Sequence, residues 1–150
     1  MKFLNYIEEN KDKKIVIYFD MDGVFAELDI GNFDYDSIRP INSIINLMKK
    51  LHDSGITVEV LSVCRNNEIV KEKLVWLKKY VPFIENDKIH LLSKEDNEGF
   101  ESNELKSNFL NDNMDNDKII IEVDDDMTII KKLLKENPKV KVYHISSLMK

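Results

Sequence analysis

The sequence predicts an α/β fold in which a parallel sheet of about five strands is flanked by helices, in a Rossmann-like arrangement. Short runs rich in β-branched residues alternate along the chain with segments whose apolar residues recur at helical spacing. The first of these runs, residues 15–19, is continuously apolar, which is typical of a strand buried on both faces. Such alternation favours parallel strands with helices on both faces of the sheet.

The expected elements follow one another with short connections. Strands are expected at residues 15–19, 57–61, 89–92, 119–123 and 140–145. Helices are expected at residues 3–9, from 41 to near 55, and at 67–80, 104–110 and 127–136. In the helix at 67–80, Val70, Leu74 and Leu77 are expected to share the buried face, and the lysine-rich runs 71–79 and 131–135 are interpreted as solvated faces.

Length and composition indicate one domain spanning residues 1–150. The chain is 43% apolar and 33% charged, with a net charge of −6, so a broad electrostatic interaction with nucleic acid is disfavoured but not excluded. No run reaches the roughly 18 apolar residues of a membrane helix, and the N-terminus lacks the apolar core of a signal peptide. The single cysteine, Cys64, excludes an internal disulfide and a multi-thiolate zinc site. We therefore expect a cytoplasmic protein with no membrane partner.

Acidic and hydroxyl side chains follow three of the expected strands. Asp20 and Asp22 come after the first strand, Ser62 after the second, and the acidic run 124–126 after the fourth. Because the carboxyl ends of parallel strands form one edge of the sheet, these side chains are expected to gather there. Gathered carboxylates repel one another and are costly to desolvate. A bound divalent cation removes the conflict, and oxygen ligands suit Mg²⁺.

The spacing of Asp20 and Asp22 predicts covalent phosphoryl transfer. Two positions apart on an extended backbone, both side chains point the same way, so that one can attack while the other handles a proton. Ser62 is expected to hydrogen-bond a phosphoryl oxygen. A fixed positive charge is also needed, and Lys106 is favoured over Lys94 because Lys106 opens a helix that leads directly into the acidic strand.

Taken together, these motifs resemble those of the haloacid dehalogenase (HAD) superfamily of phosphotransferases, over roughly residues 15–130. The resembling segments are FDMDGV at 19–24, VLS at 60–62, ELKSNFL at 104–110 and IIIEVDDD at 119–126. The resemblance implies a HAD fold in which Asp20 is the nucleophile and Asp22 the general acid/base. It also implies that Ser62 and Lys106 bind the phosphoryl group.

The same resemblance implies a Mg²⁺ site. Its ligands would be the Asp20 carboxylate, the Asp22 backbone carbonyl and an aspartate of the last motif. Asp124 and Asp125 are both candidates for that aspartate, and Asp126 is less favoured. The implied reaction is Mg²⁺-dependent hydrolysis of a phosphomonoester through an aspartyl-phosphate.

A finer resemblance is to the 5′(3′)-deoxyribonucleotidase branch of the superfamily. The segments FDMDGVFAE at 19–27 and SVCRNNEIVKEKLVWLKKYVPF at 62–83 are similar to that branch, although Asn66 replaces an expected proline. A small (deoxy)nucleotide is therefore the leading substrate. Residues 25–40 are too few for a cap domain and predict only a flap, in which Phe33 and Tyr35 are candidate contacts to a base.

Two alternatives remain open. An uncovered site also suits a phosphatase that acts on nucleic-acid ends or on phosphoproteins, and a HAD-fold protein can bind phosphate without catalysis. The sequence does not distinguish a monomer from a homodimer.

Overall fold

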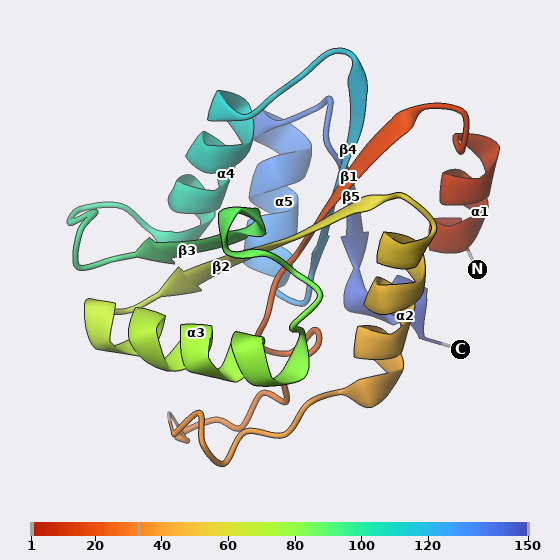
Figure 1. Cartoon of the computed structure of the whole chain (residues 1–150). Helices are drawn as coiled ribbons and strands as arrows, with labels where there is room; N and C mark the ends of the chain where they lie inside the picture. The colour runs from red at the N-terminus through yellow and green to blue at the C-terminus, as the bar shows by residue number, and fades with distance from the viewer. Residues whose placement is uncertain (1, 33, 150) are drawn as a thin grey trace.

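A five-stranded parallel sheet forms the centre of the molecule, in the order β3-β2-β1-β4-β5 (Figure 1). The structure is a computed structural model and describes residues 2–32 and 34–149. The strands are β1 (Lys14–Phe19), β2 (Thr57–Cys64), β3 (Ile89–Ser93), β4 (Lys118–Asp124) and β5 (Lys141–His144). The predicted fold class is confirmed.

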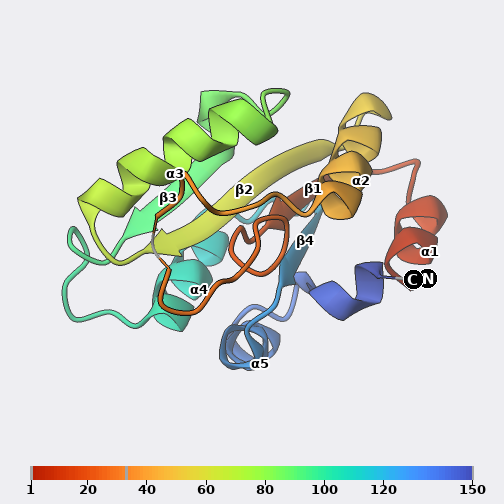
Figure 2. The ribbon, with the colours of Figure 1, turned by 90° about the horizontal axis from the view of Figure 1, so that it is seen from below.

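Helices cover both faces of this sheet. They are α1 (Lys2–Glu9), α2 (Asn42–Asp53), α3 (Asn67–Tyr80), α4 (Ser102–Asp112) and α5 (Met127–Glu136), with short 3₁₀ turns η1 (Asn86–Lys88) and η2 (Ile145–Leu148). Figure 2 shows α2 and α3 on one face and α4 and α5 on the other. No helix in the described part of the chain is long and apolar enough to cross a membrane.

Most predicted boundaries agree with the structure within two residues, and β2 differs most. It was expected to end at residue 61 but continues to Cys64, because its last residues pair with β3 up to the Cys64–Ser93 position. Helix α4 begins two residues earlier than expected, where Glu101 and Glu104 form a capping box. Ser62 and Lys106 therefore lie inside their elements rather than at the ends.

Alternate residues of each strand enter different cores. Tyr18 and Ile120 pack with Leu133 of α5 on one face, whereas Ile17 and Ile121 lie in the larger core on the other face. This alternation follows from the two-residue period of a strand. Near the carboxyl end of the sheet it determines which helix each polar side chain can meet.

The strand order places a crevice at the carboxyl end of β1. After β1 the chain adds β2 and β3 on one side, and then crosses to place β4 on the other side of β1. Ligands of open α/β sheets bind at such a reversal of direction. The ends of β1, β2 and β4, which carry the predicted site residues, border it.

The loop that follows β1 is closed at its base. Ala26 forms a bridge with Pro40, and the Glu27 amide donates to the Arg39 carbonyl at 2.9 Å. The described residues between these positions contain neither helix nor strand, and we call residues 27–39 the flap. The Trp76 indole Nε1 of α3 donates to the Ile38 carbonyl at 3.0 Å and so holds one end of the flap. Phe33, a predicted base contact, lies outside the described residues.

Candidate active site

The turn after β1 brings Asp20 into the crevice. The Asp20 amide donates to the Val123 carbonyl of β4 at 2.9 Å, which extends the pairing of β1 and β4, and the side chain is buried. Gly23 follows with a φ of 81°, a left-handed conformation that favours glycine. A Cβ atom at position 23 would lie 2.0 Å from Asp125 Oδ2. The glycine is therefore needed for the backbone and for the space that Asp125 occupies.

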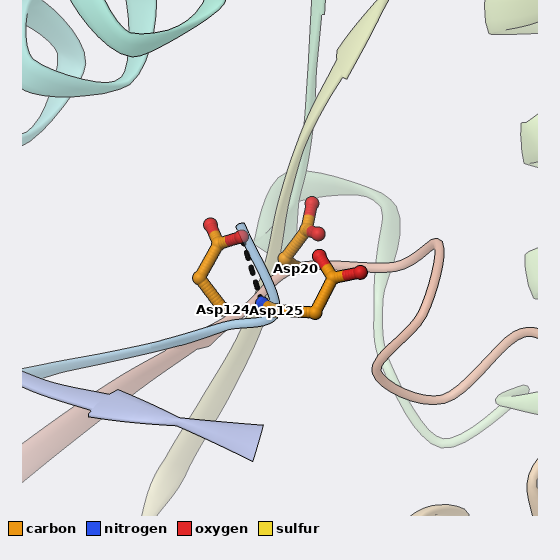
Figure 3. A group of neighbouring side chains, drawn as sticks. All are labelled: Asp20, Asp124 and Asp125. Carbon is orange, nitrogen blue, oxygen red and sulfur yellow. Dashed lines mark hydrogen bonds between the residues drawn. The ribbon is translucent and has the colours of Figure 1, made fainter. Parts of the chain in front are cut away.

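Three carboxylates meet beside this turn. Asp20, Asp124 and Asp125 each offer an oxygen, and these oxygens lie within 4.8 Å of one another. Figure 3 shows the carboxylates of Asp20 and Asp125 next to each other, with Asp124 bonded to the Asp125 amide. Asp124 Oδ1 accepts from the amides of residues 125 and 126 at 2.9 and 3.0 Å, so its carboxylate is fixed by backbone.

Asp126, the least favoured candidate ligand, has a different contact. Its side chain caps α5, because Oδ1 accepts from the Thr128 amide at 2.8 Å. It is not part of the three-carboxylate group. Of the three successive aspartates, Asp124 and Asp125 therefore stay as candidate ligands.

Lys106 of α4 forms ion pairs with two of these carboxylates. Its Nζ donates to Asp20 Oδ1 at 2.9 Å and to Asp124 Oδ2 at 2.5 Å, and it lies 3.7 Å from Glu122 Oε1. Burial alone would lower the pKa of Lys106, but these carboxylates raise it above its ordinary value, so the ammonium stays charged. Of the two predicted lysines, Lys106 makes this ion pair, and Lys94 makes none with Asp20 among the described residues.

A buried amide fixes the helix that carries Lys106. Asn137, at the end of α5, donates through Nδ2 to the Ser107 carbonyl at 3.1 Å and to Asn111 Oδ1 at 2.7 Å. The Ser107 hydroxyl donates to Asn137 Oδ1 at 2.8 Å. Because Ser107 is the next residue after Lys106, these bonds set the position from which Lys106 extends.

Ser62 lies on the opposite face of the sheet, where it meets a lysine that was not among the predicted site residues. Lys73 of α3 donates to Ser62 Oγ at 2.9 Å and to the Val63 carbonyl at 3.2 Å, and forms an ion pair with Asp22 Oδ2 at 2.8 Å. It is 1% exposed. The prediction of a solvated face over residues 71–79 is therefore wrong for this lysine.

The buried face of α3 was predicted only in part. Leu77 is buried as expected, but the other buried side chains are Ile69, Lys73 and Trp76, which lie eight, four and one positions before Leu77, instead of Val70 and Leu74. A lysine on an otherwise apolar stripe is the signal that could have identified Lys73. It was missed because neighbouring lysines at 71, 78 and 79 are exposed and suggested a uniform run.

Asp22 is held from two sides. Lys73 contacts its Oδ2, and the Tyr35 hydroxyl of the flap donates to its Oδ1 at 3.0 Å. Burial and the Asp22 carboxylate raise the pKa of Tyr35 above its usual range, so the phenol stays protonated as a donor. The Asp22 carboxylate is thus separate from the three-carboxylate group. That the backbone carbonyl of Asp22 binds Mg²⁺ stays a prediction.

Charge at the site favours a divalent cation. Burial, reinforced by Asp124, raises the pKa of Asp20 to about 7 even though Lys106 opposes the shift. Burial also raises the pKa of Asp125, and it raises the pKa of Glu122 well above its ordinary value although Lys106 opposes the shift. With all four aspartates of the site ionised, their charge of −4 and the +2 of Lys73 and Lys106 leave −2. The oxygen donors and this balance fit Mg²⁺.

Several of the site residues line a small cavity of about 300 Å³. Its polar wall includes Asp20, Asp22, Ser62, Lys106 and Asp125, and apolar side chains such as Leu28 of the flap complete it. A larger hollow, of about 1050 Å³, lies near the amino ends of β1 and β2. The smaller cavity is the candidate active site, because the converging charged groups are there.

This chain is similar to known proteins in its fold, as solved structures show, and not in its sequence. No protein-family model and no curated protein sequence gives a match. A chain of the Pnkp1/Rnl/Hen1 complex superposes with a TM-score of 0.69 at 18% identity, over 88% of this chain and 46% of the other. The N-terminal part of the Bacteroides fragilis protein BF1531, which contains a phosphatase domain and is complexed with Mg, gives 0.61 at 16%, over 92% and 38%.

A third similar structure has nearly the same length. The HAD domain of the effector protein Lem4 from Legionella pneumophila superposes with a TM-score of 0.52 at 14% identity, over 87% of this chain and 85% of the other. Against the first two structures, in contrast, this chain spans less than half of the other chain's length. At such identities the similarity shows the architecture, and the chain has the fold of a HAD domain.

Proposed function

We propose that this chain is a Mg²⁺-dependent phosphomonoester hydrolase that forms an aspartyl-phosphate on Asp20. The observation that carries the proposal is the position of Asp20: its carboxylate lies beside Asp124 and Asp125, 2.9 Å from Lys106, in the wall of the cavity. A nucleophile, a cation site and a positive charge thus converge at one point. The phosphatase domains among the similar folds support the same reaction class.

The residues that would hold Mg²⁺ are Asp20, Asp124 and Asp125, together with the backbone carbonyl of Asp22. When bound, the ion would neutralise phosphoryl oxygens and screen them from the negative nucleophile. Asp125 is the ligand whose place depends on the turn, because its carboxylate occupies the space above Gly23.

The reaction divides between the two aspartates. An oxygen of Asp20 attacks phosphorus and forms the new P–O bond while the bond to the leaving oxygen breaks, and Asp22, which enters this step in its protonated form, gives its proton to that oxygen. Asp22 then removes a proton from a water molecule, whose oxygen attacks phosphorus and releases the phosphate from Asp20. Lys106 and Ser62 bind the equatorial oxygens and stabilise the charge that they carry.

The test is hydrolysis of p-nitrophenyl phosphate in the presence of Mg²⁺. We expect Asp20→Asn to lower kcat by a factor of at least about 10³, because the amide cannot act as the nucleophile. Asp126→Asn is the matched control, since asparagine is as good an N-cap as aspartate and the substitution also removes one negative charge. Activity retained by folded Asp20→Asn, as judged by circular dichroism, contradicts the assignment.

The substrate that we propose first is a small (deoxy)nucleotide. Tyr35 of the flap contacts Asp22, the proposed proton donor to the leaving group, and its aromatic ring could therefore meet a base. Comparison of nucleoside monophosphates with simple sugar phosphates tests this proposal. A nucleotidase should show a kcat/KM for nucleotides that is at least about tenfold higher, equivalent to about 1.4 kcal/mol of added binding to the transition state.

A second candidate substrate is the phosphorylated end of a nucleic acid. It is supported by the likeness to a chain of a complex described as an RNA repair complex, and the net charge of −6 opposes it. An end-phosphorylated oligonucleotide assayed at 50 and 200 mM salt distinguishes the two. Only binding that neutralises backbone phosphates should weaken steeply with salt.

Three further expectations belong to the same proposal. The chain is expected to act as a single domain without a cap, as a cytoplasmic protein, with residues 27–39 as the cover of the site. Buried, unpaired Cys64 supports a reducing compartment. A non-catalytic role would require Mg²⁺ and phosphate binding without turnover of any monoester.

A further inference from the structure

Lys73 is a buried charge for which the proposed reaction, as described so far, has no use. Its neighbours on the buried stripe of α3 are Ile69, Trp76 and Leu77, so an apolar side chain would suit this position. Removing an ammonium group from water costs several kcal/mol unless acceptors surround it. Lys73 has three acceptors, and two of them belong to Ser62 and Asp22.

We infer that Lys73 is a positioning residue, which orients the Ser62 hydroxyl and the Asp22 carboxylate for phosphoryl transfer. The inference rests on the proposed function. It assigns separate tasks to the two buried lysines: Lys106 reaches Asp20 from α4 on one face of the sheet, and Lys73 reaches Ser62 and Asp22 from α3 on the other (Figure 2).

The contact with Lys73 determines what Ser62 can do. An ammonium group only donates hydrogen bonds, so Ser62 Oγ must act as the acceptor in this contact. The one hydroxyl hydrogen is then directed away from Lys73, and Ser62 lines the cavity together with Asp20. Ser62 is thereby prepared to donate to a phosphoryl oxygen. Without Lys73, the hydroxyl could rotate and accept from other groups.

The same ammonium fixes Asp22. Lys73 holds Oδ2 at 2.8 Å while Tyr35 donates to Oδ1 at 3.0 Å, so the plane of the carboxylate is set from α3 and from the flap. The Lys73 ammonium also lies 5.7 Å from the centre of the Tyr35 ring, which favours the contact between flap and site. In its ionised form, a carboxylate that is held at both oxygens needs little reorganisation to take a proton from the attacking water.

Kinetic measurements on Lys73→Met test the inference. We expect kcat for p-nitrophenyl phosphate to fall about 10- to 100-fold, with KM changed less than about threefold, because the orientation of Ser62 and Asp22 matters most in the transition state. Lys78→Met is the matched control, since it removes an exposed lysine from the same helix. If Lys73→Met keeps the wild-type kcat, the inference is wrong and the proposed function stands.

A double-mutant cycle gives a readout that does not depend on turnover. Orthophosphate affinity in Mg²⁺ is measured by calorimetry for wild type, Ser62→Ala, Lys73→Met and the double variant. We expect each single substitution to weaken orthophosphate binding about tenfold relative to wild type. The double variant should weaken it by at most about 20-fold, because Lys73 acts through Ser62. If the double variant instead loses about 100-fold in affinity, which is the product of the two single effects, the two residues act independently and the inference is overturned.

The two hypotheses can fail separately. Wild-type protein that binds orthophosphate but hydrolyses no monoester contradicts the proposed function, and the cycle still tests the link between Lys73 and Ser62. If circular dichroism shows that Lys73→Met is unfolded, Lys73→Gln takes its place in the cycle, because its amide keeps a donor without the charge. Protein that binds no orthophosphate contradicts both.

Discussion

At residue 23, a single hydrogen in place of a methyl group decides where a candidate metal ligand can lie. Gly23→Ala would place its Cβ on the Asp125 carboxylate and would force alanine into a left-handed conformation. We expect Mg²⁺ affinity, measured by calorimetry, to fall at least about tenfold, and the free energy of unfolding to fall by about 1–2 kcal/mol.

Gly55→Ala separates these two effects. Gly55 also has a positive φ, of 95°, but an alanine methyl group there would meet nothing within 4 Å, and the residue lies in the turn before β2 at the other end of the sheet. The control should therefore lose similar stability and keep its Mg²⁺ affinity. Equal losses of Mg²⁺ affinity in both variants would contradict the role of Gly23.

The pKa of Asp20 predicts how the stability of the metal-free protein depends on pH. Burial raises this pKa to about 7, whereas the unfolded chain has an ordinary aspartate, so the folded protein binds the proton more tightly. The contribution of this proton to the free energy of unfolding is fully present below about pH 4 and is lost as the pH rises through 7. In EDTA, the free energy of unfolding should fall by about 2–3 kcal/mol between pH 5 and pH 8 relative to Asp20→Asn. Parallel pH profiles of the two proteins would contradict this shift.

The site residues differ in how well the sequence predicts them. Asp20 and Lys106 were expected at the same site, because Asp20 follows an apolar strand and the helix of Lys106 leads directly into the acidic strand, and their side chains are in contact. Lys73 was not, since its role depends on which face of α3 is buried, and that is set by packing. Glu122 was missed for a related reason: it points into the sheet face beneath Lys106, and only the paired register of β1 and β4 reveals this.

At the scale of elements, the site depends on how α4 packs against α5. The Asn137 side chain joins the end of α5 to Ser107 and Asn111 of α4, and it is 2% exposed. Asn137→Ala should lower the free energy of unfolding by about 2–3 kcal/mol in urea denaturation, because buried partners lose their hydrogen bonds. It should also lower kcat, since Lys106 extends from this part of α4.

The control for this substitution is Asn113→Ala. Asn113 is exposed, and its side chain bonds only locally to the Phe109 carbonyl in the described structure. We expect its loss to change the free energy of unfolding by less than about 0.5 kcal/mol. If the two variants are equally stable, the Asn137 hydrogen bonds do not hold α4 to α5, and if both keep the wild-type kcat, these bonds do not set the position of Lys106.

Element boundaries were easier to predict than element contacts. The helices at 67–80 and 127–136 begin and end as expected, because Asn66 and Asp126 cap their first turns and Pro82 and Pro138 follow within two residues of their ends. The extension of β2 to Cys64 was not predictable from composition, because it arises from pairing with β3. Capping residues and prolines in the sequence therefore show where a helix lies, whereas the last residues of a strand depend on the strand that it pairs with.

At the scale of the whole molecule, the site concentrates negative charge in a chain that is already acidic. The site residues contribute −2 to a net charge of −6 when the aspartates are ionised. Mg²⁺ at 100 times its dissociation constant should stabilise the fold by about 2.7 kcal/mol at pH 8. The stabilisation should be smaller at pH 6, where Asp20 holds a proton.

Thermal unfolding with and without Mg²⁺ measures this linkage. The variant that lacks two of the site carboxylates, Asp20→Asn combined with Asp125→Asn, should show no shift in melting temperature on addition of Mg²⁺. Na⁺ at equal ionic strength is the control for general screening. A Mg²⁺ shift that survives the double substitution places the ion elsewhere on the protein.

The closed base of the flap also bears on how new specificity could arise. Since Ala26 and Pro40 are already joined, the polypeptide leaves the domain and returns to it at nearly one point. Lengthening a segment between adjacent anchors costs little, because closure entropy grows only slowly with length. The stretch from 27 to 39 is therefore a natural place to graft a longer recognition module without disturbing the chemistry beneath it.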